Sequence, residues 1–103
     1  MQLNEYQEWT KTTAIYPNDL ALTYLLLGLG SEVGEVQGKI KKFIRDDKLD
    51  VEAFLNEVGD CFWYLVRILD ELSVSAEDVL DMNKDKLESR KKKNTLKGEG
   101  DSR

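Results

Sequence analysis

The chain has 103 residues, of which 41% are hydrophobic and 34% charged, and its formal net charge is −5 at pH 7. These values predict one small globular domain that gains further burial by oligomerising, and the acidic balance argues against nucleic acid as a partner. The sequence has no histidine, one cysteine (Cys61) and no apolar run of about 18 residues, which excludes imidazole chemistry, an internal disulfide and a membrane span. We therefore expect a cytoplasmic protein.

The predicted secondary structure is helical throughout, and its four helices cover about residues 4–14, 20–44, 51–72 and 76–92. Asn4, Asp50 and Ser75 are the expected N-caps of the first, third and fourth helices. A proline-containing segment, residues 16–19, separates the first two helices. The predicted architecture is an all-α domain over residues 1–92 that resembles a four-helix bundle, followed by a flexible tail over residues 93–103.

The predicted second helix carries an acidic pair in the segment SEVGEV, where Glu32 and Glu35 are three residues apart. At about 100° per residue, Glu32 lies at the edge of the apolar stripe and Glu35 about 60° further out. The stripe consists of Leu22, Leu25, Leu26, Leu29, Val33, Val36, Ile40 and Phe43. Gly30, Gly34 and Gly38 line another side of this helix, which favours close packing of a second helix or, alternatively, approach of a ligand.

The third helix repeats the arrangement in the segment NEVGDC, where Glu57 and Asp60 lie beside its apolar face. Two carboxylates about 5 Å apart repel by about 3 kcal/mol at an effective dielectric constant of about 20. Four facing, partly buried acids therefore require protons or cations, and oxygen-only ligands favour Mg²⁺ or Mn²⁺ over zinc. The alternative is that these acids lie on a solvated helix edge. The apolar face consists of Phe54, Val58, Cys61, Phe62, Leu65, Ile68, Leu69 and Leu72.

The fourth helix supplies the opposite charge. Asn83, Lys86 and Arg90 follow at spacings of three and four and share one helix face. Cationic side chains beside an acidic metal cluster are what a polyphosphate requires, because metal ions neutralise some of its oxygens and Lys and Arg hold others. The alternative is again a solvated helix surface.

These motifs together resemble a known family. The E-x-x-E pair, a gap of 21 residues and the E-x-x-D pair, followed by N-x-x-K-x-x-x-R, are similar to the signature of MazG-like all-α nucleoside triphosphate pyrophosphohydrolases. The resemblance, closest to small single-domain bacterial and phage members, implies a homodimer or homotetramer that hydrolyses a (deoxy)nucleoside triphosphate to the monophosphate and pyrophosphate in nucleotide-pool housekeeping. It also implies Mg²⁺, with Mn²⁺ as a substitute, held by residues that are also catalytic: Glu32, Glu35, Glu57 and Asp60.

By the same resemblance, Asn83, Lys86 and Arg90 contact the triphosphate. Tyr6, Gln7 and Trp9 are expected to bind the nucleobase through stacking and amide hydrogen bonds, although packing of the first helix against the bundle is an equal alternative. Two other functions are compatible with the motifs. One is a Mg²⁺-dependent nucleotide sensor without catalysis, and the other is a helical oligomerisation module whose acids are only surface residues.

Overall fold

The computed structural model describes residues 1–101, and the regular elements in this range are all helical. They are α1 (Leu3–Thr10), α2 (Ala21–Asp46), α3 (Val51–Glu71) and α4 (Ala76–Lys92), with 3-10 turns at Lys11–Thr13 and Asn18–Leu20. The all-α prediction is confirmed, and α2, α3 and α4 begin and end within two residues of the predicted bounds. Among these helices none combines the length and apolar character that crossing a bilayer requires.

Two of the three predicted N-caps are correct. The Asp50 carboxylate accepts a hydrogen bond from the Ala53 backbone N–H at 3.1 Å, and the Ser75 hydroxyl accepts one from the Asp78 N–H at 3.4 Å. These bonds satisfy backbone donors that a helix start leaves unpaired. They fix the first residue of α3 and of α4.

The predicted cap of the first helix is wrong, because Gln2 occupies the N-cap position of α1 and Asn4 lies inside the helix. The Asn4 carboxamide oxygen instead accepts hydrogen bonds from the Ser75 hydroxyl at 2.9 Å and the Glu77 N–H at 3.3 Å. Asn4 therefore caps a helix distant in sequence. The first helix also ends at Thr10 rather than Ala14, since the chain tightens into a 3-10 turn there.

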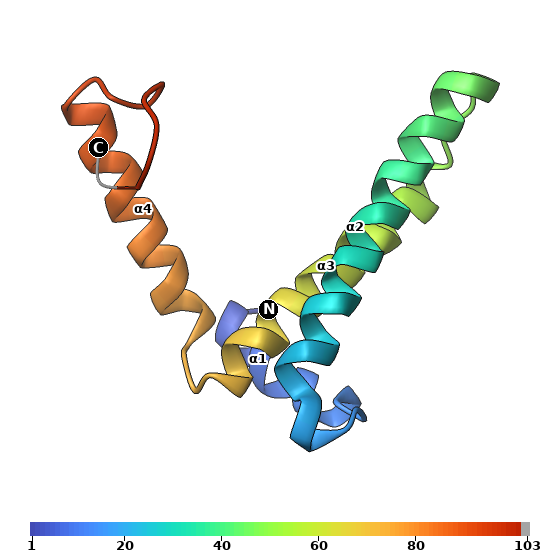
Figure 1. Cartoon of the computed structure of the whole chain (residues 1–103), viewed down its shortest axis with the longest axis horizontal. Helices are drawn as coiled ribbons and strands as arrows, with labels where there is room; N and C mark the ends of the chain where they lie inside the picture. Colours follow the sequence, from blue (N-terminus) through green and yellow to red (C-terminus); the bar gives the residue numbers. More distant parts are fainter. Residues whose placement is uncertain (102–103) are drawn as a thin grey trace.

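The helices form an open V rather than a closed bundle (Figure 1). The antiparallel helices α2 and α3 lie side by side as one limb, α4 forms the other limb, and α1 lies near the vertex. The radius of gyration is 16.6 Å, whereas a compact domain of this length has about 13 Å. The four-helix-bundle-like arrangement predicted from the sequence is thus not closed within one chain, because α4 diverges from the α2–α3 pair.

The core at the vertex is small and partly polar. Leu25 is fully buried beside Tyr16, and Arg67 is also buried, with 4% of its surface exposed. The Arg67 guanidinium donates to the Tyr16 hydroxyl at 2.9 Å and to the Asp70 carboxylate at 2.7 Å. Because a buried charge is tolerated only when it is paired and hydrogen-bonded, this network is what allows the segment between the two 3-10 turns to pack on α3.

Half of the apolar stripe predicted for α2 and α3, eight of sixteen residues, is exposed in the single chain. The exposed members include Leu22, Leu26, Val33, Ile40 and Phe43 of α2 and Phe62, Leu65 and Leu72 of α3. The sequence predicted that this stripe forms the core of a bundle, but within one chain only Leu25 of the stripe is fully buried. A surface this apolar is typical of a chain that buries it against another copy or partner.

Candidate metal centre

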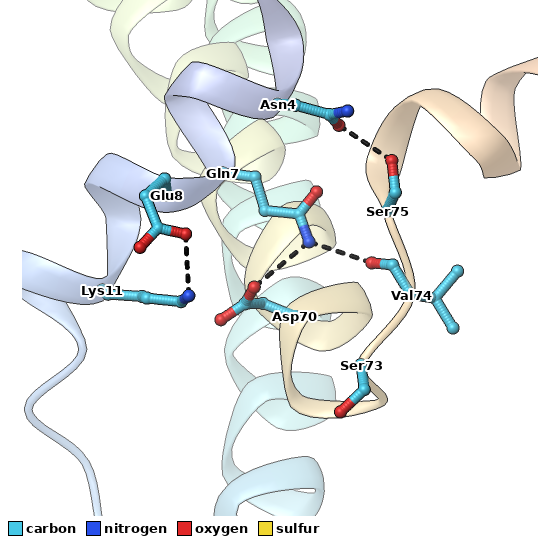
Figure 2. Close-up of a pocket in the computed structure, with 8 residues that line it drawn as sticks. All are labelled: Asn4, Gln7, Glu8, Lys11, Asp70, Ser73, Val74 and Ser75. Atoms are coloured by element: carbon cyan, nitrogen blue, oxygen red, sulfur yellow. Dashed lines mark hydrogen bonds and ion pairs between the residues drawn. The ribbon is translucent and has the colours of Figure 1, made fainter.

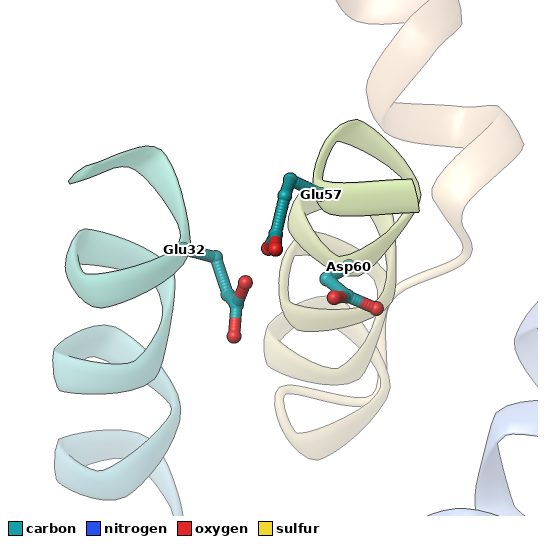
Figure 3. Close-up of side chains that lie close together, drawn as sticks. All are labelled: Glu32, Glu57 and Asp60. Atoms are coloured by element: carbon teal, nitrogen blue, oxygen red, sulfur yellow. The ribbon is translucent and has the colours of Figure 1, made fainter. Parts of the chain in front are cut away.

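Three acids from two helices meet across the α2–α3 interface. Glu32 of α2 and Glu57 and Asp60 of α3 each offer one carboxylate oxygen, and these oxygens lie within 4.8 Å of one another (Figure 3). The three-residue spacing on α3 puts Glu57 and Asp60 on the same side of that helix. The antiparallel packing of α2 then brings Glu32 to them.

Glu32 has the most strongly perturbed carboxyl group of the cluster. Burial, the adjacent carboxyl group of Glu57 and the negative charges of Asp60 and Glu35 raise the pKa of Glu32 to about 7. Burial and the charge of Glu57 also raise the pKa of Asp60. The cluster therefore repels further negative charge and holds a proton near neutral pH unless a cation replaces it.

The donor set fits a hard divalent cation. Oxygen Oε2 of Glu32 is buried and has no hydrogen-bond partner among the described residues. A buried carboxylate oxygen without a partner is costly, and a cation between Glu32, Glu57 and Asp60 would satisfy it. Carboxylate oxygens are the ligands that Mg²⁺ and Mn²⁺ prefer, so these three residues are the ones able to hold such an ion.

The fourth predicted ligand, Glu35, lies outside this group of three. Its side chain is exposed, yet its charge still contributes to the raised pKa of Glu32. Cys61 lies beside the cluster, and burial together with the charges of Glu32, Asp60 and Glu57 raises the pKa of its thiol. In the absence of a metal ion these effects favour the protonated thiol.

The predicted phosphate-binding residues of α4 are on the other limb of the V (Figure 1). Asn83 is exposed, Lys86 is half-buried and Arg90 is 5% exposed. The chain beyond α4 turns back, and the Asp101 carboxylate lies 3.2 Å from the Lys86 Nζ and 3.1 Å from the Arg90 Nη2. Lys86 and Arg90 thus share one anionic partner, but the structure does not bring them to the acids within one chain.

Gln7, which was expected to bind the nucleobase, is held within the chain by hydrogen bonds. Its amide nitrogen donates to the Asp70 carboxylate at 3.2 Å and to the Val74 carbonyl at 2.9 Å (Figure 2). Its amide oxygen accepts from the Ala76 N–H at 2.7 Å. Gln7 is 8% exposed and borders a polar pocket between α1 and the α3–α4 turn. Both ends of the amide are engaged, which favours the packing alternative over base recognition.

The aromatic residues of this region differ in how far they are engaged within the chain. Tyr6 and Trp9 stack with ring centroids 5.8 Å apart, and Trp9 is 52% exposed. Burial and the charge of Asp60 raise the pKa of Tyr6, which places α1 within electrostatic reach of the acids. Trp63 is engaged in the chain itself, because its indole N–H donates to the Thr13 hydroxyl at 2.7 Å.

The contacts of two residues of this region were not predicted from the sequence. Tyr64 follows Asp60 by one helical turn, and its ring lies against the backbone of α2 at Gly28. Arg67 interrupts an apolar run, with Asp70 and Glu71 three and four residues later. That spacing is typical of an ion pair on one helix face and could have indicated a buried pair.

Comparison with known proteins agrees with the sequence motifs. Residues 21–95 match the profile of the MazG nucleotide pyrophosphohydrolase domain. The chain is also 34% identical to the Gene 37 protein of Mycobacterium phage L5, with the whole of both chains covered. That name states no activity. A search of solved structures gives no match.

Proposed function

This chain belongs to the family of MazG nucleotide pyrophosphohydrolase domains, and we propose that it hydrolyses a nucleoside or deoxynucleoside triphosphate to the monophosphate and pyrophosphate. The observation that carries the proposal is the group of three carboxylates shared by α2 and α3. All three acids lie within the matched residues. Their convergence supports a functional metal site, because carboxylates that serve only as a solvated edge gain nothing from lying this close together.

In the proposed mechanism Glu32, Glu57 and Asp60 hold Mg²⁺, for which Mn²⁺ can substitute. A bound divalent cation neutralises phosphate oxygens and lowers the pKa of water. Glu35 is exposed and outside the group of three, which leaves it available to take a proton from the attacking water. The water oxygen bonds to the α-phosphorus, the bond from that phosphorus to the bridging oxygen breaks, and its electrons leave with the pyrophosphate.

The exposed surface supports a homo-oligomer. The chain exposes 7873 Å² of solvent-accessible surface, whereas a compact monomer of its mass exposes about 5,900 Å². The excess is about 2,000 Å² per chain, or about 4,000 Å² for two copies, which is in the range of about 2,000–5,000 Å² in total that obligate homodimer interfaces bury. An apolar pocket between α3 and α4 is a candidate seat for the partner, and it is lined by Leu3, Phe62, Leu65, Val66, Ile68, Leu69, Ala76, Val79 and Leu80.

We further propose that the α4 cations act on the acid cluster of a neighbouring copy. Lys86 and Arg90 are on the limb of the V that diverges from the acids of the same chain, which supports an active site built from two subunits. In that arrangement they hold the leaving pyrophosphate through charge-assisted hydrogen bonds. Asn83, on the same face of α4, adds an amide contact to the triphosphate.

The first test is product formation. The protein incubated with Mg²⁺ and a panel of NTPs and dNTPs should release pyrophosphate from at least one of them, and chelation of the metal should stop the reaction. Glu57→Gln should lower kcat more than about 100-fold, because even partners outside the ligand shell contribute 10–100-fold. Glu52→Gln, on the exposed first turn of the same helix, is the matched control and should keep full activity. Mg²⁺-dependent nucleotide binding without product would favour the sensor instead.

The second test separates a shared active site from one formed within a single chain. Glu57→Gln and Lys86→Ala are each expected to be inactive alone. When the two variants are co-expressed, mixed oligomers contain sites with the acids of one chain and the cations of the other, so activity should return. Mixed oligomers that stay inactive would refute the shared site and leave the proposed reaction standing.

A further inference from the structure

Gly28 is the one interior glycine of α2 against which another helix packs closely. A Cβ atom added there would lie 2.1 Å from Cε1 and 2.5 Å from Cζ of the Tyr64 ring. Gly30, Gly34 and Gly38 of the same helix have nothing within 4 Å of the corresponding position. The ring of Tyr64 thus rests directly on the α2 backbone, which only a residue without a side chain allows.

Movement of the ring is restricted on the side of Trp63. Trp63 packs edge-on against Tyr64 with centroids 5.0 Å apart and an interplanar angle of 84°. Trp63 is itself held by its hydrogen bond to Thr13 and by an edge contact with Tyr16. A methyl group added at Gly28 would clash with the Tyr64 ring. We infer that separation of α2 from α3, rather than rotation of the ring, would relieve this clash.

This contact lies one turn from the carboxylates on both helices. Gly28 precedes Glu32 by four residues, and Tyr64 follows Asp60 by four residues. In antiparallel helices these two steps run in the same direction along the interface, and each covers about one turn. Burial, followed by Tyr24 and the charges of Glu32 and Asp60, raises the pKa of the Tyr64 phenol, in keeping with its place next to the cluster.

We propose that Gly28 and Tyr64 are positioning residues, whose contact sets the separation of α2 and α3 at which Glu32 reaches Glu57 and Asp60. Ordinary van der Waals contact begins at 3.4 Å, so alanine at position 28 displaces the helices by more than about 1 Å. A displacement of about 1 Å at a reacting site costs as much as about 100-fold in rate. The inference rests on the proposed function for its catalytic consequence, and on the contact alone for its effect on metal binding.

The test uses Mn²⁺ alone as the probe, with free Mn²⁺ measured by electron paramagnetic resonance in the absence of nucleotide. Gly28→Ala should weaken Mn²⁺ binding at least about 10-fold while circular dichroism shows unchanged helix content. Gly30→Ala is the matched control, because it makes the same change on the same helix at an open position, and its Kd should stay within about 2-fold of wild type. Tyr64→Phe keeps the ring and should also bind Mn²⁺ as wild type does.

A second comparison covers the case in which Gly28→Ala does not fold. In the Tyr64→Ala background the ring is absent, so adding Gly28→Ala should cause little further loss of Mn²⁺ affinity or stability. Equal losses in both backgrounds would overturn the inference, as would a folded Gly28→Ala that binds Mn²⁺ like wild type. A wild-type protein that binds no Mn²⁺ would overturn the metal site and this inference with it. Wild-type protein that binds Mn²⁺ yet releases no pyrophosphate would overturn only the proposed reaction.

Discussion

At Glu32 the requirements of folding and of the proposed chemistry oppose each other. One of its oxygens is buried without a partner, and its carboxyl group faces the charges of Glu57 and Asp60, with Glu35 on the same helix. Folding is most favourable when Glu32 is protonated, whereas metal binding requires it to be ionised. The metal-free protein therefore stores an electrostatic penalty at neutral pH that a cation releases.

This opposition predicts the pH dependence of the metal-free protein. The pKa of Glu32 is about 7 in the folded state, above its usual value of 4.5. The folded state binds more protons in this interval, so the contribution of Glu32 to the free energy of unfolding is present below about 4.5 and is lost as pH rises through about 7. Glu32→Gln, which mimics the protonated form, should become more stable relative to wild type between pH 5 and pH 8.

Urea unfolding in the presence of a chelator measures the difference. Asp70 titrates in the opposite sense, because hydrogen bonds from Arg67 and Gln7 overcome the effect of burial and hold the pKa of Asp70 below its usual range. The comparison between wild type and Glu32→Gln cancels that contribution, since the Asp70 network is present in both. A difference that stays constant from pH 5 to pH 8 would contradict the prediction.

The helices differ in how directly the sequence defines them. Local signals define the starts of α3 and α4, because Asp50 caps α3 and Ser75 caps α4 through backbone N–H groups three residues away. The start of α1 was mispredicted, since the Asn4 carboxamide is used by α4, more than 70 residues later in the chain. Contacts of that range leave no periodic pattern in the sequence.

The packing of α1 against α3 and the turn before α4 gives a prediction about stability. Gln7→Ala removes hydrogen bonds to Asp70, to the Val74 carbonyl and to the Ala76 N–H. Leaving buried partners of this kind unpaired should lower the free energy of unfolding by about 1–3 kcal/mol. Gln37→Ala, at an exposed position of α2, should change it by less than about 0.5 kcal/mol. Equal values from urea titrations of the two variants would argue against this role of Gln7.

The candidate site was predictable only in part, because some of its contacts also join residues that are far apart in the sequence. Helical periodicity placed Glu32, Glu57 and Asp60 at facing edges, and the structure brings these three together. Helical periodicity could not reveal that Tyr64 packs on Gly28, because that contact depends on how closely two helices approach. Nor could it reveal that α4 would leave the pair, since periodicity defines the face of a helix and not its direction in space.

For the whole molecule, the open V makes stability depend on concentration. The apolar stripe of α2 and α3 and the pocket beside α4 are exposed in a single chain. If a second copy covers them, Tm should rise with protein concentration, because association stabilises the folded state by mass action. Leu65→Glu, in the exposed part of the pocket, should shift sedimentation toward the monomer. A Tm that is independent of concentration and a monomer at every concentration would contradict this.

The return of the chain onto α4 has a practical consequence. The Asp101 carboxylate is paired with the guanidinium group of Arg90 and the ammonium group of Lys86. An anion that binds to these two groups must therefore displace the carboxylate, and that displacement would report occupancy without any turnover. A spin label on Glu99→Cys, in a Cys61→Ser background, should gain mobility on titration with pyrophosphate and lose that response when Arg90 is replaced by glutamine.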